Sequence, residues 1–251
     1  MIGDIIGKIG RTAVKAVLPK LRKDFDIDFV VANGENAAGG FGITYQTARE
    51  LIDCGIDVIT SGNHIYDKKE IIPYLDGRLP LIRPINYPPS APGKGFILVD
   101  NVLVINAIGR VFVGTYDCPF RTVNELLNSI IVNPKATIVD FHAEATSEKA
   151  AFAWYLDGRV SAVVGTHTHV PTADGKVMPA GTAFISDIGM VGPINSVIGS
   201  EPIDVLDRFL LQTPNRLRIA KGSVQFNSVL IETNDDDGKA TKIERIDMEV
   251  E

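Results

Sequence analysis

Short apolar runs alternate with stretches of helical spacing through the first two thirds of the sequence. Runs of strand length lie at residues 27–32, 56–60, 103–105, 137–141 and 161–164. Between them, apolar residues recur at helical intervals over residues 44–54, 122–131 and 146–156. Because parallel strands need crossover connections, strands that alternate with helices favour a largely parallel sheet covered by helices. The alternation therefore predicts an α/β fold.

The last third of the sequence has a different pattern. Strand-like runs lie at residues 182–185, 216–219, 223–232 and 242–248, with one helical stretch at 203–211. Residues 234–238 read Asn-Asp-Asp-Asp-Gly, which suits a solvated hairpin turn, because the ligand spacing and glutamate of an EF-hand are missing. Terminal antiparallel strands predict a mixed sheet or two stacked sheets. No linker or repeat interrupts the pattern, so we expect a single domain over residues 1–251.

Charge and hydropathy narrow the classes of partner and compartment. The formal net charge is −6 and no basic block is present, which argues against general binding to nucleic acid. No apolar run approaches the ~20 residues that cross a bilayer, and the N-terminus lacks the basic leader of a signal peptide. Cys54 and Cys118 lie far apart, and Cys54 suits a core-packed helix better than a disulfide. We therefore expect a cytoplasmic protein without a membrane segment.

All four histidines follow strand-like runs. His64 comes after one run, His142 directly after another, and His167 and His169 after a third, in Gly-Thr-His-Thr-His. Open α/β sheets place their functional sites beyond the carboxyl ends of strands. Histidines that only pack in a core have no reason to share this position. The pattern predicts a site at the strand ends.

Carboxylates and amides share this position. Glu35 and Asn36 follow one strand-like run, Asn63 follows another, and Asp4 ends a short apolar N-terminal run. A mixture of imidazole, carboxylate and amide oxygen suits iron or manganese, with zinc as a third candidate. Two alternatives remain open, because Asn36 and Asn63 also suit tight turns and Asp4 also suits a helix N-cap.

Taken in order, these residues resemble the motifs of the calcineurin-like metallophosphoesterase superfamily. The resemblance is closest to one bacterial branch, the YmdB-like phosphodiesterases, and extends from Gly3 to about Gly192. The blocks that carry it are Asn33-Gly34-Glu35-Asn36-Ala37-Ala38, Gly62-Asn63-His64, Asp67-Lys68-Lys69-Glu70, Arg83-Pro84, Pro92-Gly93-Lys94-Gly95, His142-Ala143-Glu144-Ala145-Thr146-Ser147-Glu148-Lys149 and Gly165-Thr166-His167-Thr168-His169-Val170.

The resemblance implies a sandwich of two mixed β-sheets flanked by helices, with a metal site at the C-terminal ends of strands. It implies two metal ions per chain, bridged by Glu35. The remaining ligands would be Asp4, His169 and Asn36 at one metal, and Asn63, His142 and His167 at the other. A hydroxide held between the metals would attack phosphorus, and His64 would protonate the leaving oxygen as general acid.

The sequence departs from the superfamily pattern near its N-terminus. The superfamily has Asp-x-His at its first motif, but here the third position is Ile6. The first metal would therefore have fewer protein ligands, with water or Asn36 in compensation. Only Met1 and Ile2 precede Gly3, so we expect a short first strand that holds its aspartate less firmly.

The resemblance implies a hydrolase acting on phosphoric diesters, with 2′,3′-cyclic nucleotides as the favoured small-molecule substrate. It also implies a homo-oligomer. Two other functions remain open. One is a phosphomonoesterase or nucleotidase using the same metals, and the other is a regulator that binds a nucleotide or RNA without hydrolysis.

A few further residues stand out in the sequence. Glu144 is a candidate to orient a ligand histidine. Trp154 has helical spacing with Ala150 and Ala151 and is expected in the core. Asp187 lies in a block that resembles the family, but the sequence assigns it no role. Three basic residues are expected at the surface, with contact to substrate phosphate as the alternative: Arg83, Lys94 and Arg110.

Overall fold

A computed structural model describes residues 1–251, and its first sheet contains both ends of the chain. Four strands pair in the order β1 (Asp4–Ile5), β10 (Met190–Pro193), β11 (Val224–Thr233) and β12 (Ala240–Val250). The parallel pair β2 (Val31–Asn33) and β3 (Val58–Thr60) adjoins them, because Ile2 forms isolated bridges to Ala32 and Ser228. β1 runs parallel to β10, whereas β10, β11 and β12 are antiparallel, so this sheet is mixed.

The second sheet has six strands, in the order β4 (Phe96–Val99), β5 (Val102–Ile108), β6 (Ala136–His142), β7 (Ala162–Thr166), β9 (Ala183–Ile185) and β8 (Lys176–Val177). β5, β6, β7 and β9 are parallel, and the two edge strands are antiparallel to their neighbours. The parallel strands are continuous buried runs, as expected when both faces of a sheet are covered.

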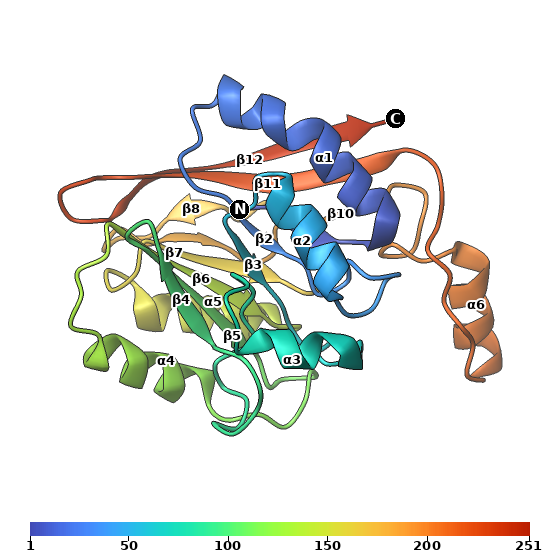
Figure 1. Ribbon diagram of the computed structural model, residues 1–251, viewed down its shortest axis with the longest axis horizontal. Helices are drawn as coiled ribbons and strands as arrows, with labels where there is room; N and C mark the ends of the chain where they lie inside the picture. Colours follow the sequence, from blue (N-terminus) through green and yellow to red (C-terminus); the bar gives the residue numbers. More distant parts are fainter.

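Helices cover the outer faces of the two sheets (Figure 1). α1 (Gly7–Asp24) and α2 (Tyr45–Asp53) lie on the side of β11 and β12, and α4 (Pro119–Ser129) and α5 (Thr146–Leu156) lie below the second sheet. Between the two sheets lies a group of buried side chains that includes Val31, Val104 and Val229, which come from strands of both sheets. The layers are therefore helix, sheet, sheet and helix, which confirms the predicted mixed α/β fold with several mixed sheets.

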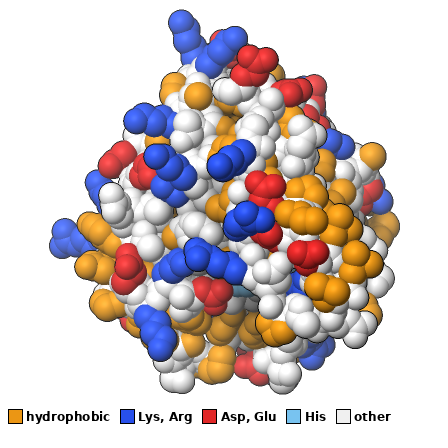
Figure 2. Space-filling view, turned by 90° about the vertical axis from the view of Figure 1, so that its right-hand side faces the viewer, with side chains coloured by type: hydrophobic (Ala, Val, Ile, Leu, Met, Phe, Trp, Pro, Cys, Tyr) orange, Lys and Arg blue, Asp and Glu red, His pale blue; other side chains and the backbone are white.

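Two further helical segments lie outside these layers. η1 (Lys69–Ile71) continues into the one-turn helix α3 (Ile72–Leu75), and α6 (Pro202–Leu211) projects at the right of Figure 1. Hydrophobic side chains gather beside charged ones on the face that carries α6 (Figure 2), and Phe209 and Leu210 of this helix are exposed. No helix of the structure combines the length and the apolarity that crossing a bilayer requires.

Several local predictions are confirmed. Thr44 caps α2 and forms a reciprocal capping box with Thr47. α5 spans Thr146–Leu156, as its spacing predicts, and residues 234–238 connect β11 to β12 as a hairpin. The N-cap of α1 is Ile6, so the alternative that Asp4 caps this helix is wrong.

Two predictions about the fold are wrong. Residues 216–219 form no strand, because Ile219 makes only an isolated bridge to Ser200. Trp154 is 57% exposed, because α5 turns Phe152, Ala153 and Leu156 toward the core. At 3.6 residues per turn, a side chain two positions after Phe152 points to the opposite side of the helix.

Candidate metal centre

The seven residues predicted as metal ligands lie at one edge of the molecule, where strands of both sheets end. Asp4 is in β1, Glu35 and Asn36 follow β2, and Asn63 follows β3. In the second sheet, His142 ends β6, and His167 and His169 follow β7. The sheets reach this edge with parallel strands, and such strands place their carboxyl ends together.

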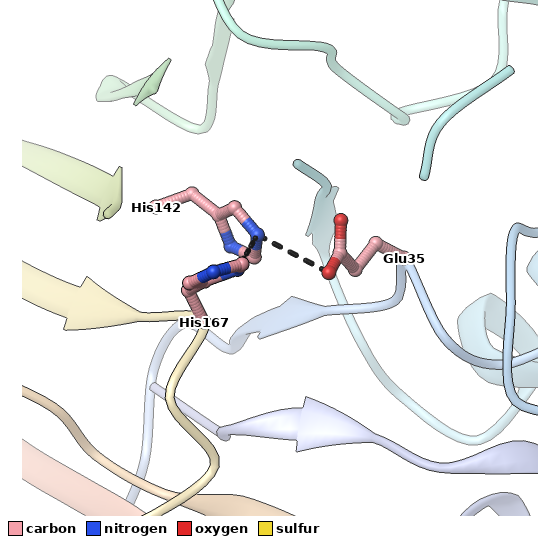
Figure 3. A group of neighbouring side chains, drawn as sticks. All are labelled: Glu35, His142 and His167. Atoms are coloured by element: carbon pink, nitrogen blue, oxygen red, sulfur yellow. Dashed lines mark hydrogen bonds and ion pairs between the residues drawn. The ribbon is translucent and has the colours of Figure 1, made fainter. Parts of the chain in front are cut away.

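Glu35, His142 and His167 form the centre of the site. Figure 3 shows the carboxylate and the two rings turned toward one another, from the ends of three different strands. Nε2 of His142 lies 3.1 Å from Oε1 of Glu35, 3.0 Å from Nδ1 of His167 and 3.1 Å from Oδ1 of Asn63. One potential ligand atom from each of Glu35, His142 and His167 lies within 4.8 Å of the other two.

This arrangement fits a cation better than a set of hydrogen bonds. A single ring nitrogen carries at most one proton, so His142 Nε2 cannot satisfy three polar neighbours at about 3 Å. Carboxylate oxygen, amide oxygen and neutral imidazole nitrogen can all donate a lone pair to the same metal ion. The donor set therefore suits a divalent transition metal between Glu35, Asn63, His142 and His167.

Asp4, Asn36 and His169 form a second group on the other side of Glu35. Nδ2 of Asn36 lies 3.2 Å from both Oε1 of Glu35 and Nε2 of His169. Nε2 of His169 is 3.7 Å from Oδ1 of Asp4, which is fully buried and has no hydrogen-bond partner. An orphaned buried carboxylate oxygen is costly unless a cation or donor meets it, so this group also fits a metal ion.

β1 is as short as expected, but Asp4 is firmly placed. Its side chain is fully buried, and its backbone N–H donates to the carbonyl of Gly189 at 3.1 Å. Its Oδ2 accepts the backbone N–H of His167 at 3.2 Å, which ties the first strand to the turn after β7. The two-residue length of β1 therefore does not leave its aspartate exposed.

The charges at the centre depend strongly on one another. Burial raises the pKa of Asp4 to about 7, against the opposing effects of His169 and His142. Burial also acts to raise the pKa of Glu35, but His142 and His64 together outweigh it and the pKa falls to about 2. Burial acts to lower the pKa of His142, but Glu35, with smaller effects of Asp4 and Asp140, raises it to about 9. The metal-free protein thus holds a buried ion pair, and a bound cation would replace its proton.

The backbone and one glycine allow the side chains to approach so closely. His167 and His169 have φ values of 102° and 64°, a region that non-glycine residues adopt at a cost of about 1–3 kcal/mol each. A Cβ atom at Gly62 would overlap the His142 ring and a Glu35 carboxylate oxygen. Only glycine fits at this position between β3 and Asn63.

His64 lies beside this cluster and does not join it. Its backbone N–H donates to Oε2 of Glu35 at 3.1 Å, and Nδ1 of its ring is 2.7 Å from Oδ2 of Asp67. The ring packs edge to face against Phe41, with 5.1 Å between the ring centres. Since Asp67 engages Nδ1, Nε2 is left for another partner.

Two residues that the sequence analysis missed orient His142. Thr166 donates its hydroxyl proton to Oδ1 of buried Asp140 at 2.7 Å, so its oxygen can accept from Nδ1 of His142 at 2.9 Å. With its proton on Nδ1, neutral His142 presents a lone pair on Nε2 toward Glu35. Asn33 and Thr60 hold the other oxygen of Asp140. A carboxylate in the buried run 137–141 was the signal available in the sequence.

Of the other polar residues that the sequence singled out, Glu144 lies beside the cluster, whereas Arg83 lies in a loop and contacts backbone carbonyls. Oε2 of Glu144 lies 3.3 Å from Nε2 of His167, which fits the expected orienting contact. Arg83 is buried and donates to the carbonyls of Pro84 and Ala91, so both expectations for it, solvent and substrate phosphate, are wrong. Its guanidinium instead satisfies backbone oxygens of a loop.

Comparisons with known proteins find relatives that match this chain over nearly its whole length and share its fold. A family model described as YmdB-like protein matches residues 1–246. A Bacillus subtilis (strain 168) protein named 2′,3′-cyclic-nucleotide 2′-phosphodiesterase is 45% identical over 249 residues, covering 98% of this chain and 94% of the relative. A crystal structure from Thermus thermophilus, described as a hypothetical protein, has a TM-score of 0.93 at 41% identity and covers 100% of this chain and 98% of that one. The crystal structure of a novel phosphatase from Mycoplasma pneumoniae has a TM-score of 0.92 at 33% identity. It covers 99% of this chain and 92% of the other.

Proposed function

The chain belongs to the YmdB-like protein family, and on this premise we propose that it is a metal-dependent phosphodiesterase that hydrolyses 2′,3′-cyclic nucleotides. It is a hydrolase of phosphoester bonds, in keeping with its relatives named phosphodiesterase and phosphatase. The observation that carries the proposal is the convergence of lone pairs around Nε2 of His142, beside the orphaned carboxylate oxygen of Asp4.

We assign Asn63, His142 and His167 to one metal, Asp4, Asn36 and His169 to the other, and Glu35 to both. A half-turn of the Asn36 amide would present its oxygen in place of its NH2 group. Iron or manganese suits this mixture of ligands, and zinc is a third candidate. When bound, two such ions supply the acidity that generates a hydroxide nucleophile and the positive charge that attracts phosphoryl oxygens.

The protein's own residues would control charge and proton transfer. Asp4 and Glu35 offset only half the charge of two divalent ions, so the site would remain attractive to a phosphodiester anion. His64 stands beside Glu35 with Nδ1 engaged by Asp67, so the doubly protonated ring, which donates Nδ1–H to Asp67, would carry a second proton on Nε2 to give to the departing oxygen. Hydrolysis of the bond between phosphorus and the 2′ oxygen would then give a nucleoside 3′-phosphate.

A second candidate is a phosphomonoesterase with the same centre. It is favoured by the Mycoplasma pneumoniae structure, which is described as a phosphatase and shares the fold at 33% identity. The two candidates differ in one product, because a monoesterase would carry the nucleoside 3′-phosphate on to nucleoside and inorganic phosphate.

The test is metal analysis together with hydrolysis of 2′,3′-cyclic AMP, 3′-AMP and bis-p-nitrophenyl phosphate, on protein purified without chelator. We expect about two metals per chain, turnover of both diesters, and loss of activity with chelator or in His142→Ala. Trp154→Phe, on the exposed side of α5, is the matched control and should behave as wild type. Turnover of 3′-AMP in preference to the diesters would support the monoesterase, and metal-loaded protein without turnover would support the binding regulator.

The predicted cytoplasmic location, homo-oligomeric state and single-domain organisation stay predictions.

A further inference from the structure

The turn after β7 holds two histidines in a strained conformation. His167 and His169, separated by Thr168, both have positive φ values, of 102° and 64°. Side chains with a Cβ atom rarely adopt this region unless the surroundings hold them there. His169 gains one such contact, because its Nδ1 lies 2.8 Å from the carbonyl of Ile198. The backbone of the turn is held by other contacts, one of which is the N–H of His167 that donates to Oδ2 of Asp4 at 3.2 Å.

A buried ion pair lies directly behind this turn. Lys149 of α5 and Asp187, which follows β9, are each only 1% exposed, and Nζ of Lys149 is 2.7 Å from Oδ2 of Asp187. This pair has no part in the proposed metal coordination. Burying two opposite charges is expensive, so a pair of this kind adds little stability by itself and calls for another explanation.

The pair forms hydrogen bonds to the backbone on both sides of His167. Nζ of Lys149 donates to the carbonyl oxygen of Thr166 at 2.9 Å, and Oδ2 of Asp187 accepts the backbone N–H of Thr168 at 3.0 Å. Oδ1 of Asp187 accepts the backbone N–H of Gly189 at 2.9 Å. Asp187 thereby fixes the turn to the segment that leads into β10, the strand beside Asp4.

We propose that Lys149 and Asp187 are positioning residues that hold the Thr166–Thr168 backbone so that His167 and His169 face the metal centre. The inference rests on the metal centre of the proposed function. It gives a role to Asp187, whose block the sequence left unexplained. Both residues act through the backbone, and neither side chain contacts the proposed ligands' rings.

The alternative is a pair that only contributes to the fold, and two variants separate the two roles. Asp187→Asn keeps the size of the side chain but has one acceptor oxygen, so it must lose an N–H partner among Thr168 and Gly189. Lys149→Met removes the donor to Thr166 and leaves the carboxylate unpaired. Leu156→Ala is the control, because it removes a fully buried side chain at the end of the same helix without touching the turn.

The experiment measures Mn²⁺ binding by titration of metal-free protein, with thermal unfolding recorded on the same samples. Binding is measured well below the midpoint of unfolding, where each variant is folded. We expect Asp187→Asn to bind Mn²⁺ about 10- to 100-fold more weakly than wild type, the range typical for losing a residue that orients metal ligands. We expect Leu156→Ala to unfold at a lower temperature and yet bind Mn²⁺ as wild type does.

Folded Asp187→Asn that binds Mn²⁺ with wild-type affinity and stoichiometry would overturn the proposal. If Lys149→Met does not fold, the milder Asp187→Asn still decides. Electron paramagnetic resonance adds a second readout, because two Mn²⁺ ions held close together give an exchange-coupled signal that a displaced histidine should weaken. Wild-type protein that binds Mn²⁺ but hydrolyses no diester would overturn the proposed activity alone, and the positioning role would still be judged by Mn²⁺ affinity.

Discussion

Nε2 of His142 at the end of β6 lies 3.1 Å from Oε1 of Glu35, two residues beyond β2. These strands belong to different sheets, so the contact joins residues from two sheets. His167 and Asp4 also join two sheets, because the backbone N–H of His167 donates to a carboxylate oxygen of Asp4. A metal ion bound at the proposed centre would therefore link strands of different sheets.

Metal binding should therefore stabilise the fold. At a concentration 100-fold above its dissociation constant, a ligand adds about 2.7 kcal/mol. For a chain of this length, each kcal/mol added to the free energy of unfolding raises the unfolding midpoint by about 2–4 °C. We therefore expect Mn²⁺ to raise the midpoint by about 5–10 °C. Thermal unfolding of chelated and Mn²⁺-loaded protein measures this. The rise should disappear in His142→Ala, and an equal rise in that variant would place the bound ion elsewhere.

Gly62→Ala should inactivate the enzyme. The added Cβ would overlap the His142 ring and Oε2 of Glu35, so one of the two ligands must move. Displacement of a catalytic group by about 1 Å commonly costs about 100-fold in rate, and we expect at least that loss for 2′,3′-cyclic AMP. The control is Gly175→Ala, whose Cβ would meet only Ile185 at an ordinary 3.7 Å. Equal activity of the two variants would contradict the close approach at Gly62.

Thr166→Val should weaken metal binding while leaving the ligands in place. The valine keeps the shape of threonine but removes the oxygen between His142 Nδ1 and Asp140, so the imidazole loses the partner that fixes its tautomer. Loss of such a partner typically costs about 10- to 100-fold in metal affinity. Titration with Mn²⁺ measures the effect. Thr166→Ser retains the hydroxyl and should bind nearly as wild type, and a serine variant as weak as the valine one would point to packing instead.

The proximity of the predicted ligands could be anticipated from sequence, because it depends on a rule that holds for parallel strands. Polar residues after buried runs meet at the strand ends, and Asp4, Glu35, His142 and His167 do lie together. Their separation in sequence did not matter, since the strands carry them to the same edge.

The residues that orient the proposed ligands could not be predicted from sequence, because their contacts depend on the register between strands. His142 pairs with Thr166 and Asp140 with Val164 across β6 and β7, and a shift of one residue would separate Thr166 from its partners. The ion pair of Lys149 and Asp187 likewise joins a helix to a distant loop. Trp154 was misplaced because spacing with small residues on one helix does not reveal which face the neighbouring sheet covers.

The loop that carries Asp174 should give a pH-dependent contribution to stability. Burial acts to raise the pKa of Asp174, but hydrogen bonds from Ser186 and Thr172 outweigh it and hold the pKa below the ordinary value. A lowered folded-state pKa stabilises the fold above the unfolded value, about 3.9, and the effect is lost as pH falls through the folded pKa. Asp174→Asn should thus be less stable than wild type in urea at pH 7. The two proteins should converge as the pH falls below the unfolded value and through the lowered folded-state pKa, and a constant difference would exclude this origin.

His64→Ala should keep its metals and lose turnover of poor leaving groups. The imidazole contacts Asp67 and Phe41 and lies outside the cluster of converging ligand atoms, so its removal should leave Mn²⁺ stoichiometry unchanged. Loss of a general acid typically lowers the rate by about 10²- to 10⁴-fold, which we expect for 2′,3′-cyclic AMP. Bis-p-nitrophenyl phosphate should suffer much less, because p-nitrophenolate departs without a proton. Asp67→Asn weakens the hydrogen bond to Nδ1 of His64, so its rate on 2′,3′-cyclic AMP should lie between those of wild type and His64→Ala. Steady-state rates on both substrates decide the matter, and wild-type hydrolysis of the cyclic nucleotide by His64→Ala would remove this residue from the mechanism.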